Sequence, residues 1–284
     1  MKKRMLSFFA CFIFPIAICA QTEADSITLV NANWEITTLS KGVVCRKAEI
    51  PSLYNVPQHI TILEIDPKYH SFDIHIHHPK AETSTEATKA GAIAAINGSY
   101  FNVRQGTSVC YLQKDKAVTD TTTASEFGLR VTGAVYIKKG KIKLIPWNKS
   151  TEQTHKARKE TILASGPLML LDGNTYDWSS CGKGFIDTKH PRSAVGISKD
   201  GKIWLIAVDG RFPGKAEGIS IPELAHMIRV LGGKEALNLD GGGSTTLWSG
   251  YAPENGILNK PCDNKQYDNQ GERKVANSLI VVKR

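Results

Sequence analysis

The sequence predicts an α+β protein, a single domain with a mixed, twisted β-sheet core and a few packed helices. Three observations predict this class: many short β-rich segments bounded by turn residues, one clear amphipathic helix, and no repeat or low-complexity linker. The 284 residues are 41% apolar and 22% charged, which is the composition of an ordinary globular protein rather than a disordered or fibrous one.

The N-terminus, residues 1–20, has the form of a secretory signal peptide. The chain begins with MKKR and continues with an apolar stretch, Met5–Ala20, shorter than the about 20 apolar residues that a membrane span needs. We therefore expect a secreted or periplasmic protein that keeps no stable membrane span once the signal is cleaved. A membrane anchor stays open as the alternative.

The charge balance bears on the partners of the protein. The formal net charge is +9, and three of the positive charges belong to the predicted signal, which leaves the mature chain near +6. The basic residues are scattered along the sequence and form no stripe. We therefore expect no nucleic-acid partner and a mild preference for anionic ligands.

The first predicted strands lie in the N-terminal third of the chain. Residues 60–65 are rich in β-branched side chains, and residues 72–77 alternate strictly between apolar and polar side chains. Residues 92–96 form a short apolar run. A weaker helix is expected just before this run, over residues 85–90.

Two hairpins are predicted further along the chain. Their turns are Lys139-Gly140 and Asp200-Gly201, dipeptides typical of tight β-turns. The paired segments are residues 134–137 with 141–145 and residues 194–197 with 203–208.

Residues 220–231 predict the clearest helix. Ser220 and Glu223 have the spacing of a capping box, and the apolar residues that follow recur at i, i+3, i+4 and i+7. The glycine pair at 232–233 ends the helix. His226 lies off the apolar stripe and is expected at the surface.

Four cysteines remain in the predicted mature chain: Cys45, Cys110, Cys181 and Cys262. They are far apart in sequence and form no C-x-x-C pair, which argues against a zinc site. Disulfides and free thiols both stay open. The sequence has no other metal-ligand spacing and no dinucleotide, P-loop or zinc-protease motif, so we expect no metal and no cofactor.

The segment Asn238–Ser244 is the most informative for function. A strand-like run leads into Asp240 and then into three consecutive glycines, a loop that is entropically costly unless close backbone approach or a positive φ is required. An acid at a strand end beside such a loop is well placed to meet a ligand. The structural alternative is a tight turn in which Asp240 bonds only to the loop.

A second candidate group surrounds the predicted hairpin of residues 194–208. Arg192 precedes its first strand, and Asp209 and Arg211 follow its second strand, so all three emerge at the same end of the sheet. Guanidinium groups match the geometry of phosphate oxygens, which suits an anionic substrate. A structural ion pair at a sheet edge is the alternative.

A third candidate group follows the apolar run of residues 92–96. Asn97 is able to bond to sugar hydroxyls, with Tyr100 or Phe101 as a stacking platform. Asn97-Gly98 is also a common turn former, so a simple turn is the alternative.

Taken together with Pro191–Gly196, these segments resemble, in their order, the phosphodiester glycosidase domain family. The resemblance runs from about residue 85 to residue 282, with Ser99 and Tyr100 in place of the commoner glycine and phenylalanine. It implies that residues 85–284 form a phosphodiester glycosidase-like domain. Residues 21–84 would supply N-terminal strands and an extension packed into the same unit.

The resemblance implies a glycosidase that hydrolyses the sugar–phosphate bond of a sugar-1-phosphodiester, of the N-acetylglucosamine type, within a phosphorylated glycan or polysaccharide. We expect Asp240 to be the nucleophile or general base and Asp209 the second acid or base. Arg192 and Arg211 would clamp the phosphate. The remaining expected substrate-binding groups are Asn97, Gly98, Tyr100, Asn238, Gly241, Gly242, Gly243 and Ser244.

Three other functions stay open on the sequence. The chain could be a non-catalytic envelope protein that binds a phosphoglycan or exopolysaccharide, a structural envelope protein whose glycine loop is only a turn, or a hydrolase of another linkage. Replacing Asp240 by asparagine separates an enzyme from a binding module, because a pure binder has no turnover to lose.

Overall fold

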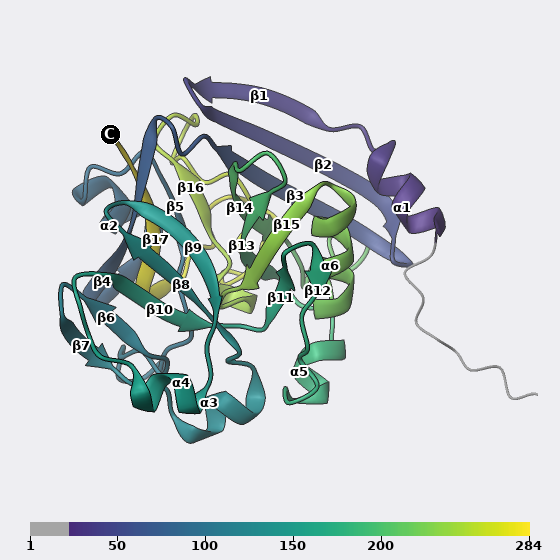
Figure 1. Ribbon diagram of the computed structural model, residues 1–284. Helices are drawn as coiled ribbons and strands as arrows, with labels where there is room; N and C mark the ends of the chain where they lie inside the picture. Colours follow the sequence, from purple (N-terminus) through teal and green to yellow (C-terminus); the bar gives the residue numbers. More distant parts are fainter. Residues whose placement is uncertain (1–22) are drawn as a thin grey trace, which may run out of the picture.

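The computed structural model describes residues 23–284 (Figure 1). The predicted signal peptide, residues 1–20, lies outside the described residues. Three antiparallel sheets pack together with a few short helices, which confirms the predicted single-domain α+β class. Across this described part of the chain, no helix is both long and apolar enough to cross a bilayer.

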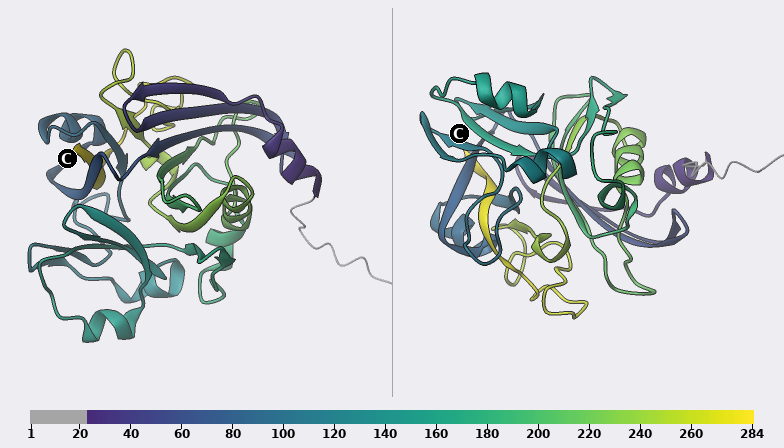
Figure 2. Two further views of the ribbon diagram at one scale, coloured as in Figure 1. Left: turned by 45° about the horizontal axis from the view of Figure 1, so that its top comes forward. Right: turned by 90° about the horizontal axis from the view of Figure 1, so that it is seen from below.

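The largest sheet has eight strands in the order β1-β2-β3-β14-β13-β15-β11-β12, and each neighbouring pair is antiparallel. The strands are β1 (Glu35–Ser40), β2 (Val43–Leu53), β3 (Val56–Ile65), β11 (Leu168–Leu171), β12 (Asn174–Thr175), β13 (Arg192–Ser198), β14 (Ile203–Val208) and β15 (Gly233–Asn238). The predicted hairpin around Asp200-Gly201 is β13–β14, with Ile197 opposite Ile203. Strands β1 and β2 form the long purple hairpin along one edge in both views of Figure 2.

Two smaller antiparallel sheets cover one face of this sheet. The five-stranded sheet contains β7 (Ala117–Asp120), β6 (Leu112–Lys114), β10 (Thr161–Ser165), β8 (Gly133–Lys138) and β9 (Lys141–Pro146), in that order. The four-stranded sheet contains β16 (Leu247–Ser249), β5 (Ala94–Asn97), β17 (Lys274–Lys283) and β4 (His70–Glu82), in that order. The predicted hairpin around Lys139-Gly140 is β8–β9, with Lys138 opposite Lys141.

The helices are short, with five to ten residues each. They are α1 (Glu23–Val30), α2 (Thr83–Lys89), α3 (Ala124–Leu129), α4 (Lys149–Thr154), α5 (Lys183–Asp187) and α6 (Ile221–Val230), with a 3₁₀ turn, η1, at Gly242–Ser244. Helix α2 confirms the weaker predicted helix. Helix α6 has the predicted capping box, in which the backbone N–H of Ser220 donates to Glu223 Oε2 at 2.9 Å.

The central strands of the eight-stranded sheet are buried on both faces, whereas the edge strands β1 and β12 are largely exposed. One face packs against the two smaller sheets and the other against α1, α5 and α6. Strand β14 is buried at every residue. Residues 60–65 and 203–208 are therefore apolar on both faces, as is typical of strands covered on both sides.

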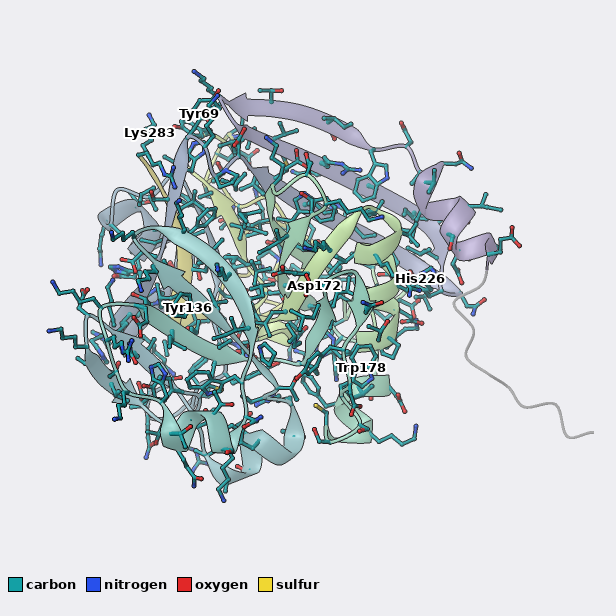
Figure 3. All side chains as sticks on the ribbon, viewed as in Figure 1. Tyr69, Tyr136, Asp172, Trp178, His226 and Lys283 are labelled. Carbon is teal, nitrogen blue, oxygen red and sulfur yellow. The ribbon has the colours of Figure 1, made fainter. Side chains whose placement is uncertain are left out.

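The expected surface position of His226 is wrong. His226 is only 6% exposed, and it lies on α6 facing α1 (Figure 3). Its Nδ1 is 2.7 Å from the hydroxyl of Tyr54, and its Nε2 is 3.1 Å from Ser26 Oγ on α1. The helical pattern of α6 gave no sign of this contact, because α1 comes from nearly 200 residues away.

The structure shows whether the four cysteines of the described residues form disulfides. Cys45, Cys110, Cys181 and Cys262 are all free, and three of them are buried. Of the two alternatives that the sequence left open, the structure has free thiols.

Candidate active site

Asn97, at the end of β5, connects the predicted motif that begins at residue 97 with the predicted motif of residues 238–244. The side-chain N–H of Asn97 donates to the carbonyl of Asp240 at 2.6 Å, and the backbone N–H of Asp240 donates to Gly98 O at 3.0 Å. Asn97 Oδ1 accepts from Ser193 Oγ at 2.7 Å and from Thr246 N at 3.1 Å. Asn97 is fully buried, so it fixes the chain positions of the site and has no free group for a sugar.

Asn238 and Tyr100 also lie beneath the site. The amide N–H of Asn238 donates to the Tyr100 hydroxyl oxygen at 2.8 Å and to Gly166 O at 3.0 Å, and both side chains are at most 1% exposed. The guanidinium of Arg130 lies 3.6 Å from the centre of the Tyr100 ring. Tyr100 therefore stacks with an arginine of this chain, in a place where a sugar was expected.

Close packing explains why residues 241–243 are all glycine. A Cβ at Gly241 would come within 2.5 Å of the carbonyl oxygen of Pro191, and the middle glycine has a φ of +62°. Side chains at the second and third glycines would collide with the guanidinium groups of Arg211 and Arg273, respectively. The loop thus leaves room for two arginines beside Asp240.

The carboxyl of Asp240 has the most informative environment of the site. Burial raises the pKa of Asp240 to about 6, against the opposing effects of Ser244, Arg130, Arg273 and the backbone N–H of Gly241. The residue keeps partial solvent exposure, and within residues 23–284 it forms no ion pair. An unpaired carboxyl that titrates near neutral pH beside cations is suited to catalysis.

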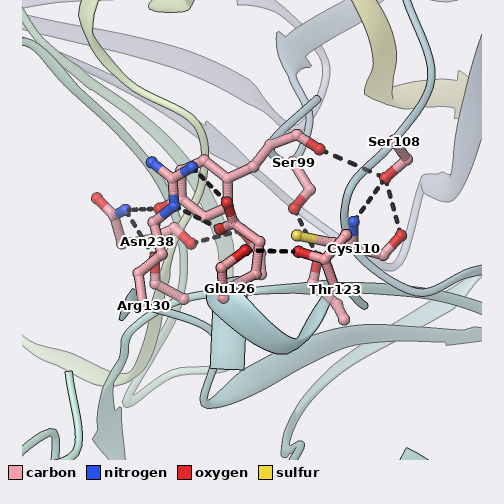
Figure 4. Close-up of polar contacts among 12 residues, drawn as sticks. Ser99, Ser108, Cys110, Thr123, Glu126, Arg130 and Asn238 are labelled. Carbon is pink, nitrogen blue, oxygen red and sulfur yellow. Dashed lines mark hydrogen bonds and ion pairs between the residues drawn. The ribbon is translucent and has the colours of Figure 1, made fainter. Parts of the chain in front are cut away.

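Two of the neighbouring arginines are held by carboxylates of their own. Arg130 forms a two-pronged ion pair with Glu126 of α3, at 2.7 Å and 3.0 Å (Figure 4). Arg273 Nε donates to Asp263 Oδ1 at 2.9 Å. These pairs fix the positions of both guanidinium groups while about a fifth of the Arg130 side chain and a third of the Arg273 side chain remain exposed. Arg211, whose guanidinium lies against Gly242, is exposed.

Arg192 does not have the geometry of the expected phosphate clamp. It is 2% exposed, and its guanidinium donates to the carbonyl oxygens of Ile219, Phe185 and Thr188 at 2.9–3.1 Å. Burial lowers the pKa of Arg192 to about 10. We therefore reassign Arg192 to holding the C-terminal end of α5 and the segment that leads into α6, a role that β13 alone could not reveal.

Asp209 is also committed to contacts within the protein. It is 1% exposed, and it contacts His59 Nδ1 at 2.5 Å, Asn259 Nδ2 at 2.8 Å and Lys260 N at 2.9 Å. Asn259 also donates to the carbonyl of Thr245 at 3.1 Å, which links this network to the end of the glycine loop. A cavity of about 500 Å³ borders the network and does not include Asp240.

Sequence reasoning missed Arg130 and Arg273. Each lies outside the motifs, Arg130 just after α3 and Arg273 just before β17. Neither has a local pattern that marks it, because Arg130 meets Tyr100, and Arg273 meets Gly243, only through packing between distant segments. For Arg273 the only sequence signal was a positive charge just before the last strand. In a chain with 36 basic residues that signal is weak.

Comparison with known proteins identifies a family and several similar proteins. The family model described as phosphodiester glycosidase matches residues 90–282. The mouse N-acetylglucosamine-1-phosphodiester alpha-N-acetylglucosaminidase is 26% identical over 188 residues, which cover 59% of this chain and 34% of that protein. The chain thus spans about a third of the length of this curated relative.

Two solved structures have a similar fold. The zebrafish N-acetylglucosamine-1-phosphodiester alpha-N-acetylglucosaminidase catalytic domain, auto-inhibited by its pro-peptide, superposes with a TM-score of 0.65 at 19% identity, covering 89% of this chain and 88% of that one. A hypothetical protein from Synechocystis superposes with a TM-score of 0.63 at 15% identity, covering 88% and 64%. At these identities the likeness establishes the fold.

Proposed function

Because the chain belongs to the phosphodiester glycosidase family, we propose that it hydrolyses the bond between sugar C1 and phosphate in a sugar-1-phosphodiester. The products are the free sugar and a phosphate monoester. An N-acetylglucosamine-type sugar on a phosphorylated glycan or polysaccharide is the proposed substrate, from the activity in the name of the mouse relative.

The observation that supports this proposal best is the Asp240 carboxyl, which forms no ion pair with any described residue and feels the charges of Arg130 and Arg273. Arg211 lies against the nearby Gly242. Cleavage of a glycosidic bond develops positive charge at C1, while negative charge gathers on the leaving group. Here the leaving group is a phosphate monoester, a weak base, so it needs cations more than it needs a proton. Arg130, Arg211 and Arg273 are the proposed cations.

Asp240 is the proposed catalytic carboxylate. With a pKa of about 6 it is mostly ionised at pH 7, and it acts on C1 as nucleophile or takes a proton from the attacking water. In either case the oxygen of one water ends on C1. The electron pair of the C1–O bond leaves with the phosphate. Asp209 is not assigned the second carboxylate role, because its oxygens already accept from three neighbours.

A release assay on the purified mature chain tests the proposal. The substrates are an N-acetylglucosamine-1-phosphodiester, the matched simple glycoside and an aryl phosphodiester, each with wild type, Asp240→Asn and the exposed control Arg104→Ala. Sugar release from the first substrate alone, lowered about 10²–10⁴-fold by Asp240→Asn and unchanged in the control, is the expected result. Full activity in Asp240→Asn contradicts the role of Asp240. Release from the simple glycoside instead points to another linkage.

We also propose a secreted or periplasmic setting, which rests on the sequence of residues 1–20 alone. Expression of the full chain in a bacterium, followed by fractionation and N-terminal sequencing, tests it. A periplasmic product that begins at Gln21 is expected, and a cytoplasmic product that retains Met1 contradicts it.

A further inference from the structure

Two neighbouring cavities lie along strand β2, away from Asp240. Their volumes are about 500 Å³ and about 440 Å³, and Glu49 of β2 borders both. We call this pair of cavities the β2 groove. Its border includes charged, polar and aromatic side chains, among them Lys47, Glu49, His59, Lys215, Lys260 and Tyr267.

A buried polar network forms the floor of the β2 groove. His59 is 5% exposed, and its Nδ1 is fixed 2.5 Å from Asp209, whose other contacts are Asn259 and the backbone N–H of Lys260. No hydrogen bond to His59 Nε2 is formed by any residue from 23 to 284, and this atom is not among the buried polar atoms that lack a partner. One ring nitrogen is therefore oriented by a carboxylate while the other stays available to a ligand.

The border of the groove is rich in hydrogen-bonding groups and electrically balanced. Three glutamates, three lysines and three asparagines line the two cavities. Tyr267 provides an aromatic wall, with Lys215 and Lys260 at 5.3 Å and 5.8 Å from its ring centre. Balanced charge disfavours a strongly ionic ligand, whereas carboxylates, amides and ammonium groups together satisfy the donors and acceptors of sugar hydroxyls.

The groove and the Asp240 site share two loops. The loop after β14 places Arg211 against the middle glycine of the site and Lys215 in the groove. The loop before β17 places Asp263 at the last glycine and Lys260 in the groove. A chain molecule bound in the groove would therefore lie next to the loops that surround Asp240.

We propose that the β2 groove binds a neutral oligosaccharide, and that this is the glycan to which the phosphodiester is attached. The binding of a neutral glycan stands on the groove alone, whereas its identity as part of the substrate rests on the proposed hydrolysis. Residues 23–66 precede the segment that the family model matches. Several of them line the groove, so their proposed role is to hold the substrate.

Calorimetric titration with mannotetraose, cellotetraose and chitotetraose tests the binding step. The protein is the full mature chain carrying Asp240→Asn, so that turnover cannot interfere. At least one of these sugars should bind, and Glu49→Ala and Lys260→Ala should each weaken it about tenfold, the effect of losing roughly 1.4 kcal/mol of hydrogen bonding. The control Lys138→Ala, an exposed lysine on β8, should leave the affinity unchanged.

Three results would overturn this site: binding of none of the three sugars, equal binding in the Glu49 and Lys260 variants, or tighter binding of a tetragalacturonate than of every neutral sugar. Glu49 is exposed and Lys260 partly exposed, so both variants are expected to fold, and their melting temperatures check it.

Turnover assays separate this inference from the proposed function. On a small sugar-1-phosphodiester the Glu49→Ala enzyme should keep wild-type kcat and KM, whereas on a glycan-linked phosphodiester its KM should rise about tenfold. Glycan binding without any turnover refutes the hydrolysis and leaves the groove intact. Turnover with an unchanged KM on the glycan-linked substrate refutes the assignment of the groove to the substrate glycan and leaves the hydrolysis intact.

Discussion

Asp240 destabilises the folded protein at neutral pH, because burial raises its pKa to about 6 from an ordinary value of 3.8. The folded state therefore binds this proton more tightly than the unfolded state does. The resulting stabilisation is complete below pH 3.8 and is lost as the pH rises through 6. A group kept at such a cost has a role other than stability.

Replacing Asp240 by asparagine should remove this pH-dependent loss. At pH 7 the Asp240→Asn protein is expected to be more stable than wild type by up to about 3 kcal/mol. At pH 3.5 the Asp240→Asn and wild-type proteins should have the same melting temperature. The exposed control Asp115→Asn should match the melting temperature of wild type at both pH values. Thermal melts across this range measure the difference. An Asp240→Asn protein that is less stable than wild type at pH 7 would show that the carboxylate is structural.

Arg130 should set the pH dependence of the reaction. Its charge lowers the pKa of Asp240, so Arg130→Met should move the acid limb of the kcat/KM profile to a pH above 6. Arg130→Lys keeps the charge and should leave the limb near its original pH. Arg104→Met, at an exposed position, is the matched control. An acid limb that does not move in Arg130→Met would mean that Arg130 acts only through packing.

A site residue could be predicted from the sequence when its role depends on its neighbours in the chain, and not when it depends on distant segments. Asp240 and its glycines form a continuous segment whose composition alone indicates a site. Arg192 and Asp209 have the right chemistry, but their burial by distant segments commits them to other contacts. Arg130 meets the site only because α3 packs beside Tyr100, which no local pattern expresses.

At the level of elements, the glycine loop should separate activity from stability. A Cβ at Gly243 would overlap Arg273 and approach Asp263 Oδ1 at 2.5 Å, and both are the flexible ends of side chains. Gly243→Ala is therefore expected to fold with nearly wild-type stability but to lower kcat/KM at least about tenfold, by displacing Arg273. Gly184→Ala in α5, where a Cβ meets nothing within 4 Å, is the control. Wild-type kinetics in Gly243→Ala would exclude Arg273 from the reaction.

Elements with strong local signals were predicted well. Helix α6 has a capping box and an apolar stripe, and the hairpins β8–β9 and β13–β14 have glycine turns. Helix α1 lacks such signals, and it is held against α6 by contacts such as Ser26 with His226. An element of this kind can be found only when its partner in space is known.

At the level of the whole molecule, the described fold should need no disulfide. All four cysteines of residues 23–284 are free, and burial raises the pKa of Cys45, Cys110 and Cys262, which slows their reaction with thiol reagents. The mature chain, denatured without reductant, should titrate four thiols. In the native protein Cys181 should react first, because it is the only one of the four that is partly exposed, although burial raises its pKa to about 11 as well. A titration of two thiols or none would require disulfides and a rearrangement of this fold.

The α+β class and single domain followed from composition, turn spacing and the absence of linkers. The strand order did not, because it depends on pairing between segments far apart in sequence, such as β3 with β14. For the same reason the β2 groove, whose walls come from both ends of the chain, had no sequence signal.

The position of β17 has a consequence for how the protein is made. This strand lies inside the four-stranded sheet, between β4 and β5, and Asn277 within it accepts a hydrogen bond from the backbone N–H of Ser99. A nascent chain on the ribosome therefore cannot complete this sheet until residues 274–283 have been synthesised. Up to that moment the polypeptide stays incompletely folded, so this sheet forms only after nearly the whole chain has been made.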